Sequence, residues 1–245
     1  MGRLTSKDKS WLKANQIALF FYETETSSVI EGRLKFNRKG YVESLKKEIA
    51  RDDAYLIRIE IPENDTVPRV YETGGRLEKA FNKHRAKLKS ELDLHMYKIN
   101  SEVCLCAPQQ LEIGYQEDKS VQHLMEMFVI PFFYSQSYFE EYGEWPWDHL
   151  PHDAPGIIEW YLNNHELPGA ARETIKALQK FKSNNMIALL NRGQRRDSFN
   201  PNNKCLCGSS KSFLACDPRH RALLKLALEI RLGPHRRNRA GRTTQ

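Results

Sequence analysis

Five cysteines in two groups are the residues of this 245-residue chain with the clearest chemical potential. Cys104 and Cys106 flank a single residue, and Cys205, Cys207 and Cys216 form a second group about a hundred residues later. Thiols act as nucleophiles, redox centres or metal ligands, and an odd number with two Cys-x-Cys pairs is a poor framework for disulfides. The grouping therefore predicts reactive or metal-binding thiols in a reducing compartment.

Cys104 is the candidate nucleophile, because it lies in an irregular stretch that a turn beside a sheet would expose. A cysteine nucleophile must be partly exposed and have a lowered pKa. His95 lies nine residues upstream and is a candidate neighbour, although spacing leaves its contact with the thiol open. In an extended segment Cys106 would share a face with Cys104, which permits transfer between sulfurs, disulfide formation or metal ligation. Spacing alone favours the competing interpretation that both are small buried hydrophobic residues.

The second cysteine group has the spacing of a metal-binding knuckle. Cys205 and Cys207 flank one residue before a Gly-Ser turn, and Cys216 and His220 follow, four residues apart. Tetrahedral zinc takes four Cys or His ligands, and a structural site takes all four from the protein. We predict a structural zinc ion held by Cys205, Cys207, Cys216 and His220, with Asp217 as the alternative fourth ligand.

The elements that position these residues are predicted from apolar periodicity. Alternation predicts strands at 29–36, 55–61 and 69–72, and the turns between them favour an antiparallel meander. Helical spacing predicts helices at 10–21, 76–94, 120–133, 157–164, 170–191 and 219–232. Ser120 is a candidate N-cap, and Pro131 is expected to kink its helix. An α+β fold follows, an antiparallel meander sheet with flanking helices.

Composition and charge limit the class of protein. Hydrophobic residues make up 40% of the chain and aromatic residues 10%, enough to close a core, which argues against global disorder. The formal net charge is +7. No apolar stretch is long enough to span a membrane and no signal-peptide core is present, so we expect a soluble cytoplasmic protein. Beyond Glu229 the chain holds arginines but no acid. A solvated basic tail is favoured there over contact with an acidic partner or nucleic acid.

The order of these elements resembles ubiquitin-conjugating enzymes over roughly 10–161. In that family a His-Pro-Asn motif precedes a cysteine followed by leucine, and the cysteine carries a ubiquitin-like protein as a thioester. Here His95 precedes the run Val103-Cys104-Leu105. The segment 143–146 (Gly-Glu-Trp-Pro) is similar to bacterial members found in anti-phage defence operons, among them the cyclic-oligonucleotide signalling (CBASS) systems. The helix at 76–94 looks like an insertion relative to eukaryotic members.

The resemblance implies that Cys104 is the thioester cysteine and His95 the motif histidine. The second thiol, Cys106, departs from the family pattern and suggests transfer between thiols or redox control. Met96 and Tyr97 take the proline and asparagine positions of the motif. Because the family asparagine holds a loop and stabilises an oxyanion, its absence counts against lysine-directed isopeptide formation; Asn100 is the substitute considered.

The predicted function is a transferase that takes the C-terminus of a protein as a thioester in anti-phage defence. The expected partners are a ubiquitin-like protein or a nucleotidyltransferase-type protein with a reactive C-terminus, an activating enzyme and a deconjugating protease, with no membrane. The alternative is a non-catalytic adaptor or a nucleic-acid-binding protein that contains structural zinc.

The run from Cys205 to Cys216, with Lys211 and Phe213 inside it, resembles the SEC-C motif, a zinc-binding element of many bacterial proteins. We therefore predict four parts. They are a ubiquitin-conjugating-enzyme-like domain over 1–165, a helix and linker over 166–200, a SEC-C-like zinc module over 201–233 and a disordered basic tail over 234–245.

Overall fold

The computed structural model describes residues 4–36, 53–64, 66–88, 94–97, 100–146 and 153–180, with short stretches at 202, 211–212, 215–216 and 226. The chain forms two compact units, Met1–His149 and Leu150–Gln245, whereas the sequence prediction ended the first domain at residue 165. The predicted linker beyond residue 180, the predicted helix at 219–232 except residue 226, most of the zinc module and the tail lie outside the described residues.

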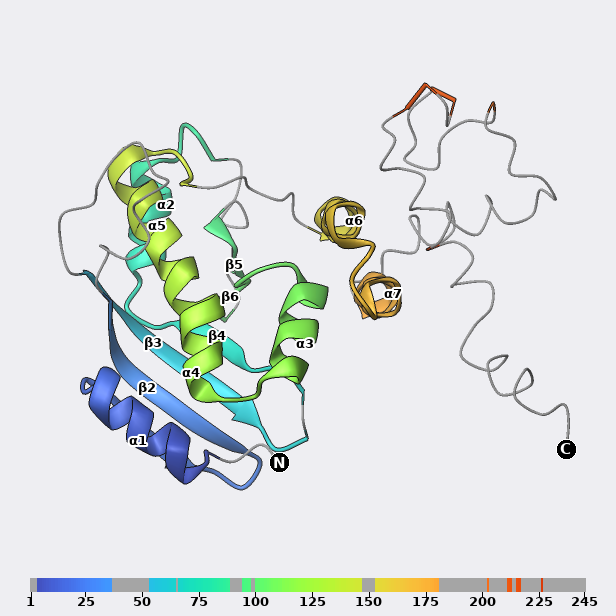
Figure 1. The fold of residues 1–245 in the computed structure, drawn as a ribbon. Helices are drawn as coiled ribbons and strands as arrows, with labels where there is room; N and C mark the ends of the chain where they lie inside the picture. Colours follow the sequence, from blue (N-terminus) through green and yellow to red (C-terminus); the bar gives the residue numbers. More distant parts are fainter. Residues whose placement is uncertain are drawn as a thin grey trace, which may run out of the picture. The chain divides into compact units, whose positions relative to one another are not determined.

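The first unit is built on a six-stranded antiparallel sheet with the order β1-β2-β3-β4-β6-β5 (Figure 1). Its strands are β1 (Leu19–Glu23), β2 (Ser27–Phe36), β3 (Asp53–Pro62), β4 (Arg69–Glu72), β5 (Met96–Tyr97) and β6 (Glu102–Val103). The predicted meander is confirmed as β2, β3 and β4, and β1 extends it by one strand. The fold is α+β with an antiparallel sheet and flanking helices.

The first helix is shorter at its C-terminal end than predicted. α1 (Ser6–Asn15) begins at a capping box, in which the Thr5 side chain accepts the Asp8 N–H and Asp8 accepts the Thr5 N–H. The predicted helix over 10–21 was wrong beyond Asn15, because Leu19–Glu23 form strand β1 and pair with β2. Ile17, an apolar residue that fits the helical spacing of this segment, is exposed.

Helices cover one face of the sheet and close its core. α4 (Val121–Leu124), the π-helical turn η3 (Met125–Val129) and α5 (Ile130–Tyr142) follow one another across that face (Figure 1). The strand register aligns apolar residues from neighbouring strands beneath them, in the row Phe21, Ile30, Ile59 and Val70. The Tyr55 ring lies 4.7 Å from the Phe133 ring of α5. Apolar packing between the meander and α5 therefore fixes the scaffold.

The helix after Ser120 is confirmed, and it contains a π-turn just before Pro131. The Ser120 hydroxyl accepts the His123 N–H at 3.1 Å and caps α4. A proline inside an α-helix lacks the donor for the carbonyl four residues earlier and its ring clashes with that carbonyl. The wider turn η3 lies immediately before Pro131, and such a turn shifts the bonding pattern by one residue. The proline is thus accommodated by a π-turn.

A buried carboxylate connects α1 to α4. Asp8 is 6% exposed, and its Oδ1 accepts the Val121 N–H at 2.8 Å while its Oδ2 accepts the Thr5 N–H at 2.9 Å. One side chain therefore satisfies orphan donors at the N-termini of two helices. This contact holds α1 beside α4.

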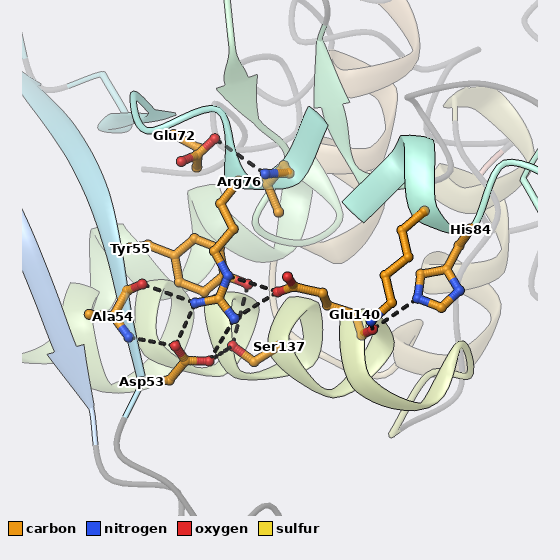
Figure 2. A network of polar contacts seen from close by, with 10 residues as sticks. Asp53, Ala54, Tyr55, Glu72, Arg76, His84, Ser137 and Glu140 are labelled. Carbon is orange, nitrogen blue, oxygen red and sulfur yellow. Dashed lines mark hydrogen bonds and ion pairs between the residues drawn. The ribbon is translucent and has the colours of Figure 1, made fainter. Parts of the chain in front are cut away.

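Helix α2 (Arg76–Lys83) is fixed by an ion network that involves β3 and α5 (Figure 2). The prediction of a helix to residue 94 was too long, since α2 ends at Lys83. Arg76 donates from Nη2 to Asp53 Oδ2 at 2.9 Å and from Nε to Glu140 Oε2 at 2.7 Å. Its guanidinium also lies over the Tyr55 ring, 4.2 Å from the centroid. The Arg76 guanidinium thus joins α2, β3 and α5.

The ion network lowers the pKa of Asp53. Burial alone would raise this pKa, but hydrogen bonds from Arg76 and Ser137 and the charge of Arg76 lower it to about 2. Because the folded-state pKa lies below the ordinary value of 3.8, ionised Asp53 stabilises the fold above that pH. The contribution is lost as the pH falls through about 2.

The C-terminal end of α5 is capped by basic side chains of α2 and the turn after it. Lys83 Nζ and His84 Nε2 both donate to the Glu140 carbonyl oxygen, at 2.6 and 2.9 Å, and Lys87 Nζ donates to the Gly143 carbonyl oxygen at 3.1 Å. Cations favour this end of a helix. Lys83 and Lys87 are therefore more than part of a solvated helix face, because their ammonium groups contact the carbonyl oxygens at the end of α5.

The second unit contains a pair of helices in its described part. α6 (Asp153–Asn164) and α7 (Ala170–Lys180) pack together, and the turn between them includes Gly169 at φ 81. Tyr161 and Leu178 are fully buried. The helix predicted at 157–164 is confirmed with an earlier start. The helix predicted at 170–191 is confirmed as far as residue 180.

We predict that Arg76→Ala lowers the free energy of unfolding by about 2–3 kcal/mol, since it leaves the Asp53 carboxylate without its cation. The measurement is urea denaturation of the full chain. Lys79→Ala, on an exposed position of the same helix, is the matched control and should change stability by less than about 0.5 kcal/mol. Equal stabilities of the two variants would show that the network contributes nothing.

Candidate functional site

The site begins with a short hairpin made by β5 and β6. At its tip the Asn100 side chain accepts the Glu102 N–H at 3.1 Å and donates to Glu102 Oε2 at 3.1 Å. The Ser101 N–H donates to the Tyr97 carbonyl oxygen at 2.9 Å, and Ser101 has φ 58. β6 also pairs with β4 through Tyr71 and Glu102. The hairpin is therefore an extension of the sheet, held at its tip by a turn.

Cys104 lies at the base of this hairpin. Its N–H donates to the His95 carbonyl oxygen at 2.7 Å, which continues the ladder beyond the Met96–Val103 pair. Met96 and Val103 are buried, so the alternation of strand side chains directs Cys104 to the other face. Its side chain is partly exposed, and the sulfur donates to the Cys106 carbonyl oxygen at 3.4 Å. A thiol at the end of a fixed strand meets the positional requirement for a nucleophile.

The structure brings His95 and Cys104 together through the backbone. The His95 ring meets the Trp145 ring edge-on with centroids 5.8 Å apart, and the Phe132 ring at 6.5 Å. His95 has φ 56, a left-handed conformation that is uncommon for a residue with a side chain. The sequence prediction of proximity is supported at the level of the main chain, and these ring contacts indicate a role in packing.

Cys106 is in a different environment from Cys104. The residue is partly exposed, but it packs against the main core, and burial raises the pKa of its thiol well above the usual range. The nearby Cys104 adds to this increase, and a hydrogen bond with the Leu111 backbone opposes it. Cys106 is therefore protonated near neutral pH. Cys106 is therefore poorly suited to attack as a thiolate, which leaves Cys104 as the candidate nucleophile.

The helix that follows the cysteines is packed closely on the π-turn. α3 (Pro108–Glu117) starts with Pro108 in its first turn, after which Gly114 faces Phe128 of η3. A Cβ on Gly114 would lie 2.6 Å from the Phe128 ring. The absence of a side chain at Gly114 permits this approach. The contact holds α3, which follows Cys106, against η3.

Sequence reasoning missed Trp145 as part of the site. The aromatic residues and prolines between 134 and 155 predict irregular chain packed onto the core. Tyr134, Tyr138 and Phe139 are indeed buried, but they lie on helix α5, so the prediction of irregular chain was wrong for them. The contact of Trp145 with His95 spans fifty residues of sequence. The sequence feature that could have indicated this role is the position of Trp145, an aromatic residue two positions after the glycine that ends α5.

Of the predicted zinc ligands, the structure describes Cys216 alone, with a partly exposed side chain. Cys205, Cys207, His220 and the alternative Asp217 lie outside the described residues. Within the part that is described, no group of three or more His, Cys, Asp or Glu residues is arranged to hold a metal ion. The zinc site stays a prediction from sequence.

Comparisons with protein-family models, with curated proteins and with solved structures found no match to this chain. None of the described helices is long and apolar enough to cross a membrane. The site must therefore be interpreted from its own geometry.

We predict that iodoacetamide at pH 7.5 modifies Cys104 at least about tenfold faster than Cys106, because the Cys106 thiol is held protonated by burial. Peptide mass spectrometry after timed labelling of the native chain measures both rates. Labelling in denaturant is the control and should bring the two rates together. Equal rates in the native chain would contradict the assignment of unequal thiols.

Proposed function

We propose that this chain is a transferase that forms a thioester between Cys104 and the C-terminus of a ubiquitin-like or other protein partner. The observation that carries the proposal is the partly exposed Cys104 thiol at the base of the β5–β6 hairpin, fixed through its N–H. Support also comes from the order of the elements: a helix, an antiparallel meander, a cysteine at an irregular turn and a helix crossing the sheet. This is the order that the resemblance to ubiquitin-conjugating enzymes implies.

The proposed step is an acyl transfer. The Cys104 thiolate attacks the carbonyl carbon of a partner C-terminus that an activating enzyme already holds as a thioester. The new carbon–sulfur bond forms, the bond to the activating enzyme breaks, and its sulfur leaves as a thiolate that takes up a proton. The product keeps the energy of a thioester and can pass its acyl group to an amine or another thiol.

The identity of the final acceptor depends on what stabilises the oxyanion. Tyr97 replaces the asparagine that the family uses for this purpose, and the Asn100 amide is committed to the hairpin turn with Glu102. Asn100 in this conformation is therefore a poor substitute. The proposal assigns thioester formation to Cys104 and leaves transfer to lysine without a dedicated oxyanion donor.

The partner and its setting are proposed from the same resemblance. A bacterial anti-phage defence operon would supply a ubiquitin-like protein, or a nucleotidyltransferase-type protein, with an activating enzyme and a deconjugating protease. In this setting Cys106, two residues from the acyl carrier, would affect how long the thioester persists. Its buried thiol is a poor competitor for the acyl group at neutral pH.

A non-catalytic adaptor is the second candidate. It is favoured by Met96 and Tyr97 at the motif positions and by the engagement of Asn100 in the turn. An adaptor would bind its partner without any covalent adduct. Adduct formation therefore separates the two candidates.

We predict that the wild-type chain, incubated with the neighbouring ubiquitin-like protein, its activating enzyme and ATP, gains one partner mass in an adduct that dithiothreitol removes. Cys104→Ala should form none, and Cys104→Ser should form an ester that resists dithiothreitol. Cys106→Ala should keep the adduct with a changed lifetime. Lys79→Ala, on an exposed position of α2, is the control and should keep it. Wild-type protein that stays unmodified would favour the adaptor.

We also propose that Cys205, Cys207, Cys216 and His220 hold one structural zinc ion, the ligand types and number being those of a closed tetrahedral site. Metal analysis of the purified chain should find close to one zinc per chain, and Cys205→Ser should lose most of it, because three ligands bind far more weakly. His220→Ala and Asp217→Ala separate the two candidates for the fourth ligand. Equal zinc content in Cys205→Ser and wild type would refute the site.

A further inference from the structure

A series of contacts connects the end of α5 to the backbone beside Cys104. Trp145 stacks on Phe139 with ring centroids 4.5 Å apart and an interplanar angle of 24°. The same indole meets the His95 ring at 5.8 Å and 78°. The His95 carbonyl oxygen then accepts the Cys104 N–H at 2.7 Å. Two ring contacts and one hydrogen bond therefore join Phe139 to the thiol-bearing residue.

His95 is the strained link in this series. Its φ of 56 is a conformation that costs an ordinary residue about 1 kcal/mol or more, and it persists only where the surroundings impose it. On one side, the Leu94 carbonyl oxygen accepts Gln136 Nε2 at 2.9 Å; on the other, Met96 is buried. The ring of His95 lies against Trp145 and Phe132. Side-chain packing thus acts directly on the strained residue.

The place of Trp145 is set by the end of α5. Gly143, at φ 67, donates its N–H to the Phe139 carbonyl oxygen at 2.7 Å and ends the helix. Lys87 Nζ, 3.1 Å from the Gly143 carbonyl oxygen, holds the turn from outside. A Cβ on Gly143 would lie 2.6 Å from that ammonium group. Trp145 follows two residues later on a chain whose direction is fixed.

We propose that Trp145 is a positioning residue for Cys104: its indole keeps His95 in the left-handed conformation, so that the His95 carbonyl oxygen faces the Cys104 N–H. Without the indole, His95 relaxes toward negative φ and its carbonyl turns away. Cys104 then loses the hydrogen bond that holds it at the hairpin base. The catalytic consequence rests on the proposed function, whereas the effect on the backbone does not.

The direct test is hydrogen exchange of the Cys104 amide, measured by NMR on the full chain. Trp145→Ala should accelerate this exchange about tenfold, which corresponds to the loss of its aromatic contacts. Trp145→Phe, which keeps a ring, should restore most of the protection. Trp11→Ala is the matched control, since Trp11 packs against the main core from α1, and it should leave the Cys104 amide unchanged. The Ile30 amide of β2 reports any general loss of stability.

A second background tests whether Trp145 acts through His95. Glycine adopts the left-handed conformation without strain, so in a His95→Gly chain the further change Trp145→Ala should alter Cys104 exchange less than about twofold. A full tenfold effect in that background would overturn the proposal, as would exchange in Trp145→Ala that equals wild type or rises equally at Ile30.

The same variants carry the catalytic readout. Trp145→Ala should slow formation of the Cys104 adduct severalfold while Trp145→Phe and Trp11→Ala stay near wild type. If no variant, wild type included, forms an adduct, the proposed function fails and the exchange data still decide the positioning role.

Discussion

The hydrogen bond from the Cys104 N–H to the His95 carbonyl oxygen is the interaction on which the site depends. It fixes where the β5–β6 hairpin ends and which face the next side chain takes. Val103 turns into the core and Cys104 is left partly exposed. A shift of one residue in this pairing would bury the Cys104 thiol and expose Val103. The register of the β5–β6 hairpin therefore determines that the Cys104 thiol is accessible.

The register of the hairpin is maintained by elements that lie far apart in the sequence. The meander and α5 form the apolar core, and Gln136 of α5 holds the backbone at Leu94. Arg76 joins α2 to β3 and α5, and the basic residues that follow cap the end of α5. The helix inserted between β4 and the hairpin is thus integrated into the fold. It supports the hairpin through α5, which contacts both Arg76 of α2 and the backbone at Leu94.

The contrast between the two thiols follows from this arrangement. Both side chains are partly exposed, but Cys104 ends a strand whereas Cys106 packs against the core. Burial disfavours the thiolate, so the pKa of Cys106 rises and its nucleophilicity at neutral pH falls. An acyl group on Cys104 would consequently have a neighbouring thiol that reacts slowly. Under the proposed function, this contrast would let Cys104 keep its acyl group until an acceptor arrives.

Sequence alone was sufficient where a single element carried its own signal. The alternation in Tyr55–Ile61 and the hydroxyl of Ser120 before an apolar run predicted a strand and a helix start that the structure has. Prediction from sequence failed where tertiary contacts determine the local structure. β1 was absorbed into a helix, since Ile17 and Phe21 also fit helical spacing, and the π-turn before Pro131 was not predicted.

The site was predictable only in part for the same reason. The two-residue strands β5 and β6 are too short to show a period, and they form because β4 and α5 hold them. The left-handed conformation of His95 has no local signature, because its support comes from Trp145 and Phe132. Cys104 itself was identifiable from its type and neighbours, whereas its orientation required the register of the hairpin.

The most direct test of the central claim replaces the thiol with an amine. A Cys104→Lys chain, incubated with the activated partner, should accept the same acyl group as an amide that neither dithiothreitol nor hydroxylamine cleaves. Tandem mass spectrometry should locate the branch at position 104. A branch at any other residue, or none while the activating enzyme is itself charged with the partner, would contradict the account.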